Sequence, residues 1–113
     1  MRLTKTLYTI HETEGELIGY DPFGRPKYSE PFIEFKVFKG EREPYSSNLA
    51  EKTYGIFVEV TDRLFCKPNP NIIADAKILY NEETYRVMKP PFEFEKHIEV
   101  LIKKEALANG SQN

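Results

Sequence analysis

The stretch HETEGE, residues 11–16, holds the side chains most capable of chemistry. It places one histidine among three glutamates: His11, Glu12, Glu14 and Glu16. An imidazole beside carboxylates can bind a metal ion or transfer protons. However, the second histidine, His97, is distant, and the sequence has no His-x-x-x-His or Cys-x-x-Cys spacing. Because Gly15 and the dense charge are equally typical of a solvated turn, we favour a turn and predict no metal site.

Three further groups of residues have side-chain types used in catalysis. Cys66 is the single cysteine, and a thiol acts as a nucleophile only with a base beside it, which neither neighbour supplies. We interpret it as a small, half-buried apolar residue. Two acid pairs have a spacing that acid–base catalysis can use: Glu82 with Glu83, and Glu93 with Glu95. The first pair fits a soluble turn and the second a half-exposed strand. We therefore predict that the protein is not an enzyme and needs no cofactor.

The segment FIEFKVFKGER, residues 32–42, interleaves aromatic and basic side chains. They are Phe32, Lys36, Phe38, Lys39 and Arg42. Small barrels bind single-stranded nucleic acid with such a face. The glutamates in and after this segment dilute its charge, and the whole chain has a net charge of −2, with 16 basic and 18 acidic residues. The electrostatic footprint of a nucleic-acid binder is therefore missing, and we keep this function as the alternative interpretation.

Residues 39–53, KGEREPYSSNLAEKT, are predicted to form a long charged loop. Gly40 and Pro44 argue against a regular strand, while Ser47 is placed to cap one short helical turn over residues 48–52. Loops of this length often carry function. Mixed charge suits a contact with a neighbouring subunit in a ring, and equally a loop that faces water; the sequence leaves both open. The candidate contact residues are Glu41, Arg42, Glu43, Tyr45, Glu51 and Lys52.

Period-two alternation of apolar residues predicts the strands that must position these groups. The four single strands expected are Thr6–His11, Phe32–Phe38, Tyr54–Thr61 and His97–Lys103. Alternation is clearest in the second, where Ile33, Phe35 and Val37 share one face. A hairpin is expected from residues 77–80 and 84–88 around a three-residue loop. The segments 19–27 and 89–94 are rich in Pro and Gly and predict turns.

These elements predict a mainly β fold: a small, antiparallel, partly closed β-barrel with at most one short helix. The composition agrees, with 40% hydrophobic and 30% charged residues and eight Phe and seven Tyr. A chain of 113 residues is long enough for one domain. We place the barrel domain at residues 1–105 and a flexible C-terminal tail at residues 106–113, where the sequence becomes small and polar.

The sequence also predicts where the protein acts. One cysteine cannot form an internal disulfide, which fits a reducing compartment. The start, MRLTKTLYTI, has no apolar core of a signal peptide, and no apolar run approaches the length of a membrane span, about 18 residues. We therefore expect no membrane partner, and a protein of the cytosol or of a particle assembled there.

The order of features along roughly residues 5–104 is more specific than any single feature. A strand, a Gly/Pro turn and a central strand precede a charged segment, the run YGIFVEV, the hairpin and the run HIEVLIKK. This order resembles the head-closure proteins (head–tail connectors or stoppers) of tailed bacteriophages and prophages. The residues that match the pattern are Ile78, Tyr80, Asn81, Tyr85, Val87, His97, Glu99, Val100 and Leu101.

The resemblance implies a structural virion protein at the head–tail junction, present in the host cytoplasm during assembly. Copies of the barrel would form a ring between a portal or adaptor protein and a tail-completion or tail-tube protein. A long loop, here residues 40–53, would reach toward the axis and help to retain packaged DNA, touching it only in the channel. A near-neutral chain with acidic loop residues agrees with this role, because Lys and Arg contacts to phosphates would hinder ejection.

Overall fold

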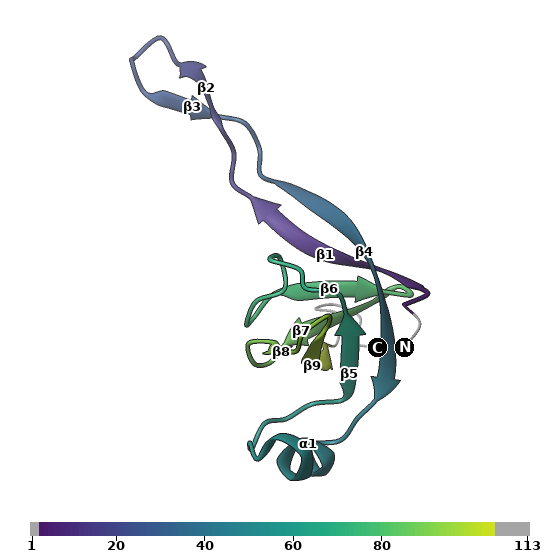
Figure 1. Cartoon of the computed structure of the whole chain (residues 1–113). Coiled ribbons are helices and arrows are strands. Elements are labelled where there is room, and N and C mark those ends of the chain that lie inside the picture. The colour runs from purple at the N-terminus through teal and green to yellow at the C-terminus, as the bar shows by residue number, and fades with distance from the viewer. Residues whose placement is uncertain (1–2, 106–113) are drawn as a thin grey trace.

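The computed structural model describes residues 3–105, and over them the fold is mainly β, as predicted (Figure 1). The strands are β1 (Lys5–Thr13), β2 (Leu17–Tyr20), β3 (Pro26–Tyr28), β4 (Phe32–Pro44), β5 (Asp62–Cys66), β6 (Lys77–Tyr80), β7 (Glu83–Val87), β8 (Phe92–Glu93) and β9 (Ile98–Glu105). The one helix within this range is α1 (Ser47–Tyr54). The predicted tail, residues 106–113, lies outside the described residues.

Six antiparallel strands form a closed barrel, in the order β5-β4-β1-β6-β7-β9, with β9 pairing back onto β5. The barrel is therefore fully closed rather than partly closed. Short β8 adds to the far end of β9. Closure satisfies the backbone groups that an open sheet would leave at its edges. It also turns one face of every strand toward a shared interior.

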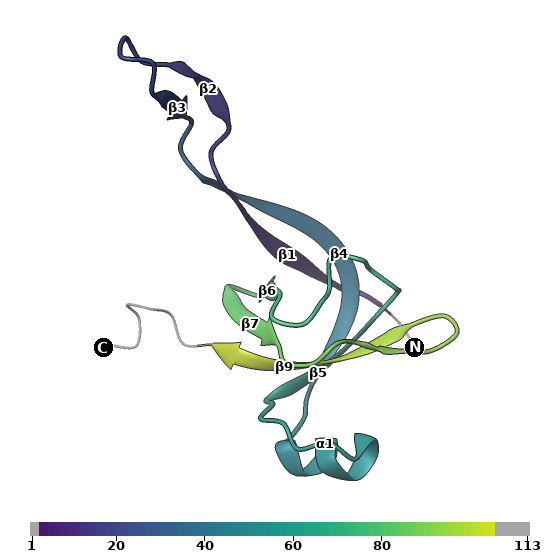
Figure 2. The same cartoon turned by 90° about the vertical axis from the view of Figure 1, so that its left-hand side faces the viewer.

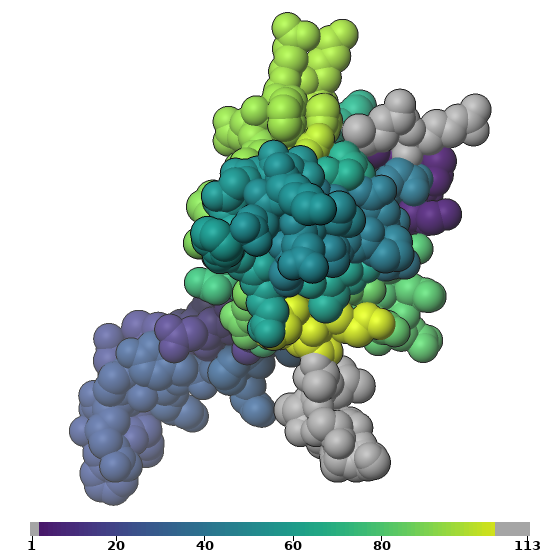
Figure 3. All heavy atoms as spheres, turned by 90° about the horizontal axis from the view of Figure 1, so that it is seen from below, coloured from purple at the N-terminus to yellow at the C-terminus, as the bar shows by residue number. Residues whose placement is uncertain are grey.

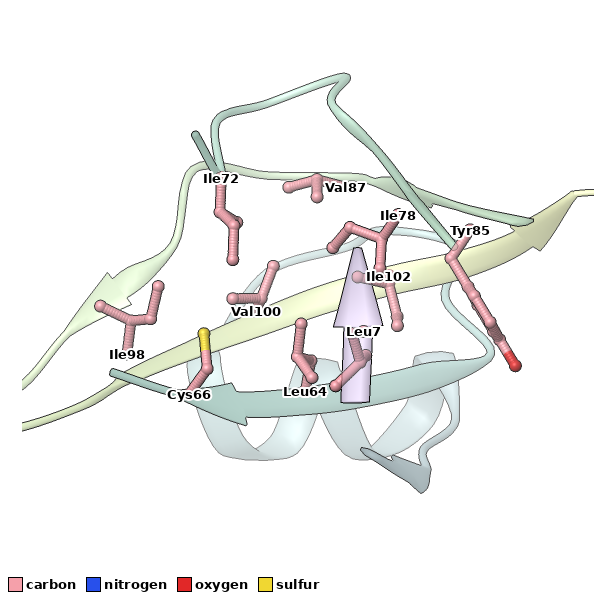
Figure 4. Close-up of a cluster of buried hydrophobic side chains, with 10 residues drawn as sticks. All are labelled: Leu7, Leu64, Cys66, Ile72, Ile78, Tyr85, Val87, Ile98, Val100 and Ile102. Atoms are coloured by element: carbon pink, nitrogen blue, oxygen red, sulfur yellow. The ribbon is translucent and has the colours of Figure 1, made fainter. Parts of the chain in front are cut away.

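The barrel interior is filled by aliphatic side chains from five of its strands (Figure 4). Leu7 from β1, Leu64 from β5 and Ile78 from β6 are completely buried, as are Val87 from β7 and Val100 from β9. Burying each such side chain contributes about 1.5–3 kcal/mol. This cluster is the main source of stability in the part of the chain that the structure describes.

The segment predicted as a loop, residues 39–53, is instead the end of β4 followed by α1. Ser46, not Ser47, caps the helix: its hydroxyl accepts a hydrogen bond from Leu49 N at 3.1 Å. Ser47 Oγ accepts one from Val60 N at 3.2 Å. The helix ends at Gly55, whose φ of 72° is the left-handed conformation that glycine adopts without strain.

The strand predicted at Tyr54–Thr61 was wrong, because α1 already includes Tyr54 and the following residues have no ladder partner until β5 begins at Asp62. The alternation is nevertheless real. Ile56, Val58 and Val60 pack with the helix against the outside of the barrel. Alternating burial therefore arose here from an irregular segment covering a sheet, and β5, the strand that completes the barrel, was missed.

The β6–β7 hairpin lies where it was predicted, but its loop has two residues rather than three. Tyr80 pairs with Glu83, and Asn81 and Glu82 both have positive φ, 52° and 67°. That combination is a type I′ turn, whose twist matches the flanking strands.

Strand β4 changes partner at Gly40, which pairs with Lys5 of β1 and also with Cys66 of β5. A Cβ atom at Gly40 would lie 2.8 Å from the carbonyl oxygen of Phe65, so only glycine fits without a backbone shift. From Gly40 to Pro44, β4 pairs with β5, whereas residues 32–39 pair with β1, and the outer part of this β1–β4 pair is a projecting ribbon.

That ribbon makes the molecule elongated. Residues 11–36, here called the arm, leave the barrel as paired β1 and β4 and end in the β2–β3 hairpin, on the side away from α1 (Figures 1 and 2). The molecule measures 61 × 39 × 26 Å, and its radius of gyration is 17.7 Å. A compact chain of this length would have about 13 Å. The arm also stands clear of the body when the molecule is seen from below (Figure 3).

Candidate functional site

One apolar face runs along the strands of the arm and continues onto the outer surface of the barrel at its base. Residues opposite each other in an antiparallel pair share a face. The pairs on this face are Tyr8 with Val37, Ile10 with Phe35 and Glu12 with Ile33. The Tyr8 and Phe35 rings also meet edge to face, 6.4 Å between centroids. We call Tyr8, Ile10, Ile33, Phe35 and Val37 the outer apolar face.

Most of this face is open to solvent. Ile33 is 58% exposed, Phe35 52% and Val37 63%. Alternation in a strand normally turns the apolar residues inward and the polar ones outward. Here the barrel core takes the opposite face, with Leu7 and Thr9 buried. Contiguous exposed apolar residues mark interaction surfaces in soluble proteins, so this face is the strongest candidate functional site.

The arm also has unpaired edges within residues 3–105. Strand β1 pairs with β6 only over Tyr8–Ile10, and β4 pairs with β5 only from Gly40 onward. Between these points and the tip, the arm is a two-stranded ribbon. Such a ribbon is marginally stable alone in water. Its exposed backbone groups and apolar side chains would both gain from a protein partner.

The tip of the arm is ordered by local polar contacts rather than by a core. Asp21 accepts hydrogen bonds from the backbone N–H groups of Phe23 (2.8 Å) and Arg25 (2.9 Å), and forms an ion pair with the Arg25 side chain at 2.7 Å. These bonds, first the backbone bond from Arg25, lower the pKa of Asp21. The tip still exposes large side chains: Leu17, Ile18, Tyr20, Phe23 and Tyr28.

The predicted contact residues of segment 40–53 do not form a projecting loop. On β4, Glu41 accepts two hydrogen bonds from Thr4, which lower the pKa of its carboxyl group, and Arg42 forms an ion pair with buried Asp62. Glu43 pairs with Arg63. Tyr45 is buried, Glu51 and Lys52 are exposed on α1, and together these residues do not make one surface.

An aromatic and polar cluster, which sequence reasoning missed, joins α1 to the barrel wall. Arg63 donates hydrogen bonds to Glu43 (2.8 Å) and to Tyr54 Oη (3.1 Å), and Tyr54 donates to Glu99. Burial, together with the Glu99 contact, raises the pKa of Tyr54 to about 12. His97 lies 3.2 Å from Glu99. Every group has a partner within the cluster, which points to a structural role in fixing the helix.

The residues first considered for catalysis are dispersed. His11 Nε2 lies 2.8 Å from the Thr9 hydroxyl, at the base of the arm. Cys66 is in the barrel core, and burial raises the pKa of its thiol to about 12, far from a reactive thiolate. Glu82 lies in the hairpin turn, Glu83 pairs with Lys104 at 2.6 Å, and the Glu93–Glu95 segment is exposed.

The residues considered for nucleic-acid binding are also separated. Phe38 packs against the core, Lys39 Nζ donates to the Thr6 hydroxyl at 2.6 Å, and Arg42 is held by Asp62. Among the residues described, Phe32, Lys36 and Lys39 of that set are exposed, and Phe32 is the one exposed aromatic residue among them. This arrangement is not a stacking platform lined by positive charge.

No group of three or more His, Cys, Asp or Glu side chains in residues 3–105 is arranged to hold a metal ion. No helix of this range is long and apolar enough to cross a membrane.

The comparisons with known proteins bear on the fold. No protein-family model matches the chain, and no curated protein matches it. Among solved structures, the chain is similar to the solution structure of protein SF1141 from Shigella flexneri 2a, with a TM-score of 0.63 and 15% sequence identity. The match covers 93% of this chain and 95% of the Shigella protein. At this identity the likeness shows a shared fold over almost the whole of both chains.

Proposed function

We propose that this protein is a non-enzymatic structural subunit of the head–tail junction of a tailed phage or prophage. In this role, copies form a ring between a portal or adaptor protein and a tail-completion or tail-tube protein, and the ring helps to retain packaged DNA. The order of sequence features that resembles head-closure proteins motivates the proposal. The single structural observation that supports it is the exposed outer apolar face of the arm.

The arm supports an assembly role because its exposed apolar side chains are unfavourable in an isolated chain. Its apolar side chains lie in water, and its two strands lack further partners over residues 11–13 and 32–39 within the described part of the chain. A surface of this kind is stabilised only when another protein covers it. A subunit of a stacked ring meets such a protein on several sides.

Binding of single-stranded nucleic acid has less support. The aromatic and basic residues that suggested it are divided between the core, an ion pair and the surface. The arm itself is acidic, with six acidic and three basic residues in positions 11–36. Acidic surfaces repel phosphates, so the most exposed surface of the molecule disfavours a nucleic-acid partner.

Deleting the gene in the source phage or prophage tests the proposal. The expected result is DNA-filled heads and separate tails in electron micrographs, with joined virions restored by the gene on a plasmid. The genes on either side should encode a portal or capsid protein and a tail protein. Normal virions from the deletion strain, together with metabolic neighbours, would overturn the head–tail role.

A further inference from the structure

We infer that the arm of one copy docks onto the barrel body of a second copy of this chain, in a head-to-tail contact. The contact joins the outer apolar face, together with the exposed apolar residues of the tip, to the barrel end where the arm begins, which holds an apolar trough. This inference deepens the proposed function and rests on it for the ring, but the pairwise contact has its own test. It assigns the contact to the arm, in place of residues 40–53.

The apolar surface that the arm presents is large enough for a stable contact. The outer apolar face and the tip together present ten apolar or aromatic residues, most of them about half exposed or more. A large aromatic side chain buries 150–250 Å² when fully covered, so half-exposed residues leave on the order of 100 Å² each. The sum approaches the area that a standard specific interface buries on each partner, about 800 Å².

The surface that receives the arm is a trough formed by the β5–β6 connection and the segment before β8. Two hollows meet there at Pro68 and Asn69. The side chains lining them are mainly apolar and include Pro70, Ile73 and Pro91. Ile73 is 61% exposed, so this surface too leaves an apolar side chain in water. A head-to-tail contact needs two different complementary surfaces on each copy, and the arm and the trough are two such surfaces.

Charge favours a contact between copies over a contact with an acidic partner. The arm has six acidic and three basic residues, which leaves 12 acidic and 13 basic residues in the rest of the chain. The residues that line the trough include Lys39 and Lys67 and one acidic residue, Glu93, so its charge is net positive. An acidic arm therefore meets a basic rim when it docks on another copy, whereas two arms side by side would repel each other.

A photo-cross-linking amino acid in place of Phe35 tests the contact in the full-length protein. Irradiated at millimolar concentration, the chain should give dimers and a ladder of higher species. Mass spectrometry should map the cross-links to residues 67–73 or 91–98 of a second copy. High salt should reduce the yield, because the rim charges are exposed.

Two pairs of substitutions on the same strand separate the faces of the arm. Ile33→Ser with Val37→Ser removes apolar side chains beside the probe and should lower the cross-linked fraction more than about tenfold. The matched control, Glu34→Ser with Lys36→Ser, changes the opposite face and should leave the yield within about twofold. Circular dichroism checks that the barrel is folded in both variants.

Other results would overturn the inference. Cross-links from arm to arm would mean that the ribbons pair symmetrically, and no intermolecular cross-link at millimolar concentration would mean that the arm binds a different protein. These outcomes are separate from failure of the proposed function. A chain that cross-links as expected, but whose deletion leaves virions normal, forms this contact outside a head–tail junction.

Discussion

Strands β1 and β4 pass through two environments, and the contrast between them defines this protein. At one end they are two of the six strands of a closed barrel, where Leu7 and Thr9 are buried and further strands pair on both sides. At the other end the same two strands form the arm, where residues 32–37 of β4 are all exposed. Both ends have alternating apolar residues and the same antiparallel register.

Alternation of apolar residues therefore specifies strand pairing but not what covers the apolar face. In the barrel, closure brings six strands around one core, and α1 with residues 56–60 covers part of the outside. In the arm nothing within residues 3–105 covers the face of Ile33, Phe35 and Val37. The barrel should therefore be stable in a single chain, while the arm should depend on a partner.

The largest expected effect comes from truncating one side chain in each environment. Leu64→Ala in the barrel should lower the free energy of unfolding by about 2–5 kcal/mol, because it leaves a cavity in a closed core. Phe35→Ala on the arm should change it by less than about 0.5 kcal/mol in dilute solution. Urea unfolding followed by circular dichroism measures both. Equal losses of stability would contradict the contrast between barrel and arm, because they would mean that the arm is packed in the monomer.

Ion pairs should show the same contrast at a smaller size. Asp62 is buried at one end of the barrel and pairs with Arg42 Nη1, while the buried Nε of Arg42 has no hydrogen-bond partner among residues 3–105. Asp62→Asn should lower the free energy of unfolding by about 2 kcal/mol, less than for a fully buried pair because Arg42 is partly exposed. Arg25→Gln, at the exposed tip, should cause no measurable change. A larger loss at the tip than in the barrel would contradict the account.

Two tyrosine hydroxyls, one at the barrel wall and one at the tip of the arm, should also differ in their contribution to stability. Tyr54 stacks on Phe92 with 4.2 Å between ring centroids and donates to Glu99, so it fixes α1 to the barrel wall. Tyr54→Phe should lower the free energy of unfolding by about 1 kcal/mol. Tyr20→Phe, on the exposed tip, should have no effect, as checked in thermal melts. If both variants melt like the wild type, the cluster around Arg63 does not hold the helix.

The last prediction concerns pH and the buried thiol, whose effect appears only in alkaline solution. Burial raises the pKa of Cys66 from an ordinary 9.0 to about 12, so the folded state holds this proton more tightly than the unfolded state. Its stabilising contribution is complete below pH 9 and is lost as the pH rises toward 12. Stability measured across this range should fall less steeply in Cys66→Ala. The same slope in both proteins would show that the thiol is solvated.

Sequence reasoning identified the class of fold because it depends on local pattern. Alternation predicted β1, most of β4 and β9, and the two runs at residues 77–80 and 84–88 predicted the β6–β7 hairpin. The closed barrel was not derivable in detail, because closure rests on the pairing of β5 with β9, two strands far apart in the sequence. Strand β5, DRLFC, carries two charged residues in five positions, which hid it.

The candidate site was harder to predict, and for a physical reason. Ile33, Phe35 and Val37 were recognised as one face. However, the sequence of a strand does not indicate whether that face packs against the protein's own core or against another molecule. Arg42 and Glu43 looked like part of a loop because their ion-pair partners, Asp62 and Arg63, come 20 positions later in the chain. Charges that are neutralised across strands are indistinguishable in sequence from charges that face water.

The proposal that the barrel is stable in a single chain while the arm depends on a partner is best tested by hydrogen exchange at single-residue resolution. This experiment measures the local stability of the arm and of the barrel together. In dilute protein, the amides of β5 and β9 should exchange only through global unfolding, whereas those of residues 11–13 and 32–37 should exchange orders of magnitude faster. At millimolar concentration, or in the assembled particle, the arm should become protected while β5 and β9 stay unchanged. An arm as protected as the barrel in dilute solution, or one that stays unprotected after assembly, would contradict the account.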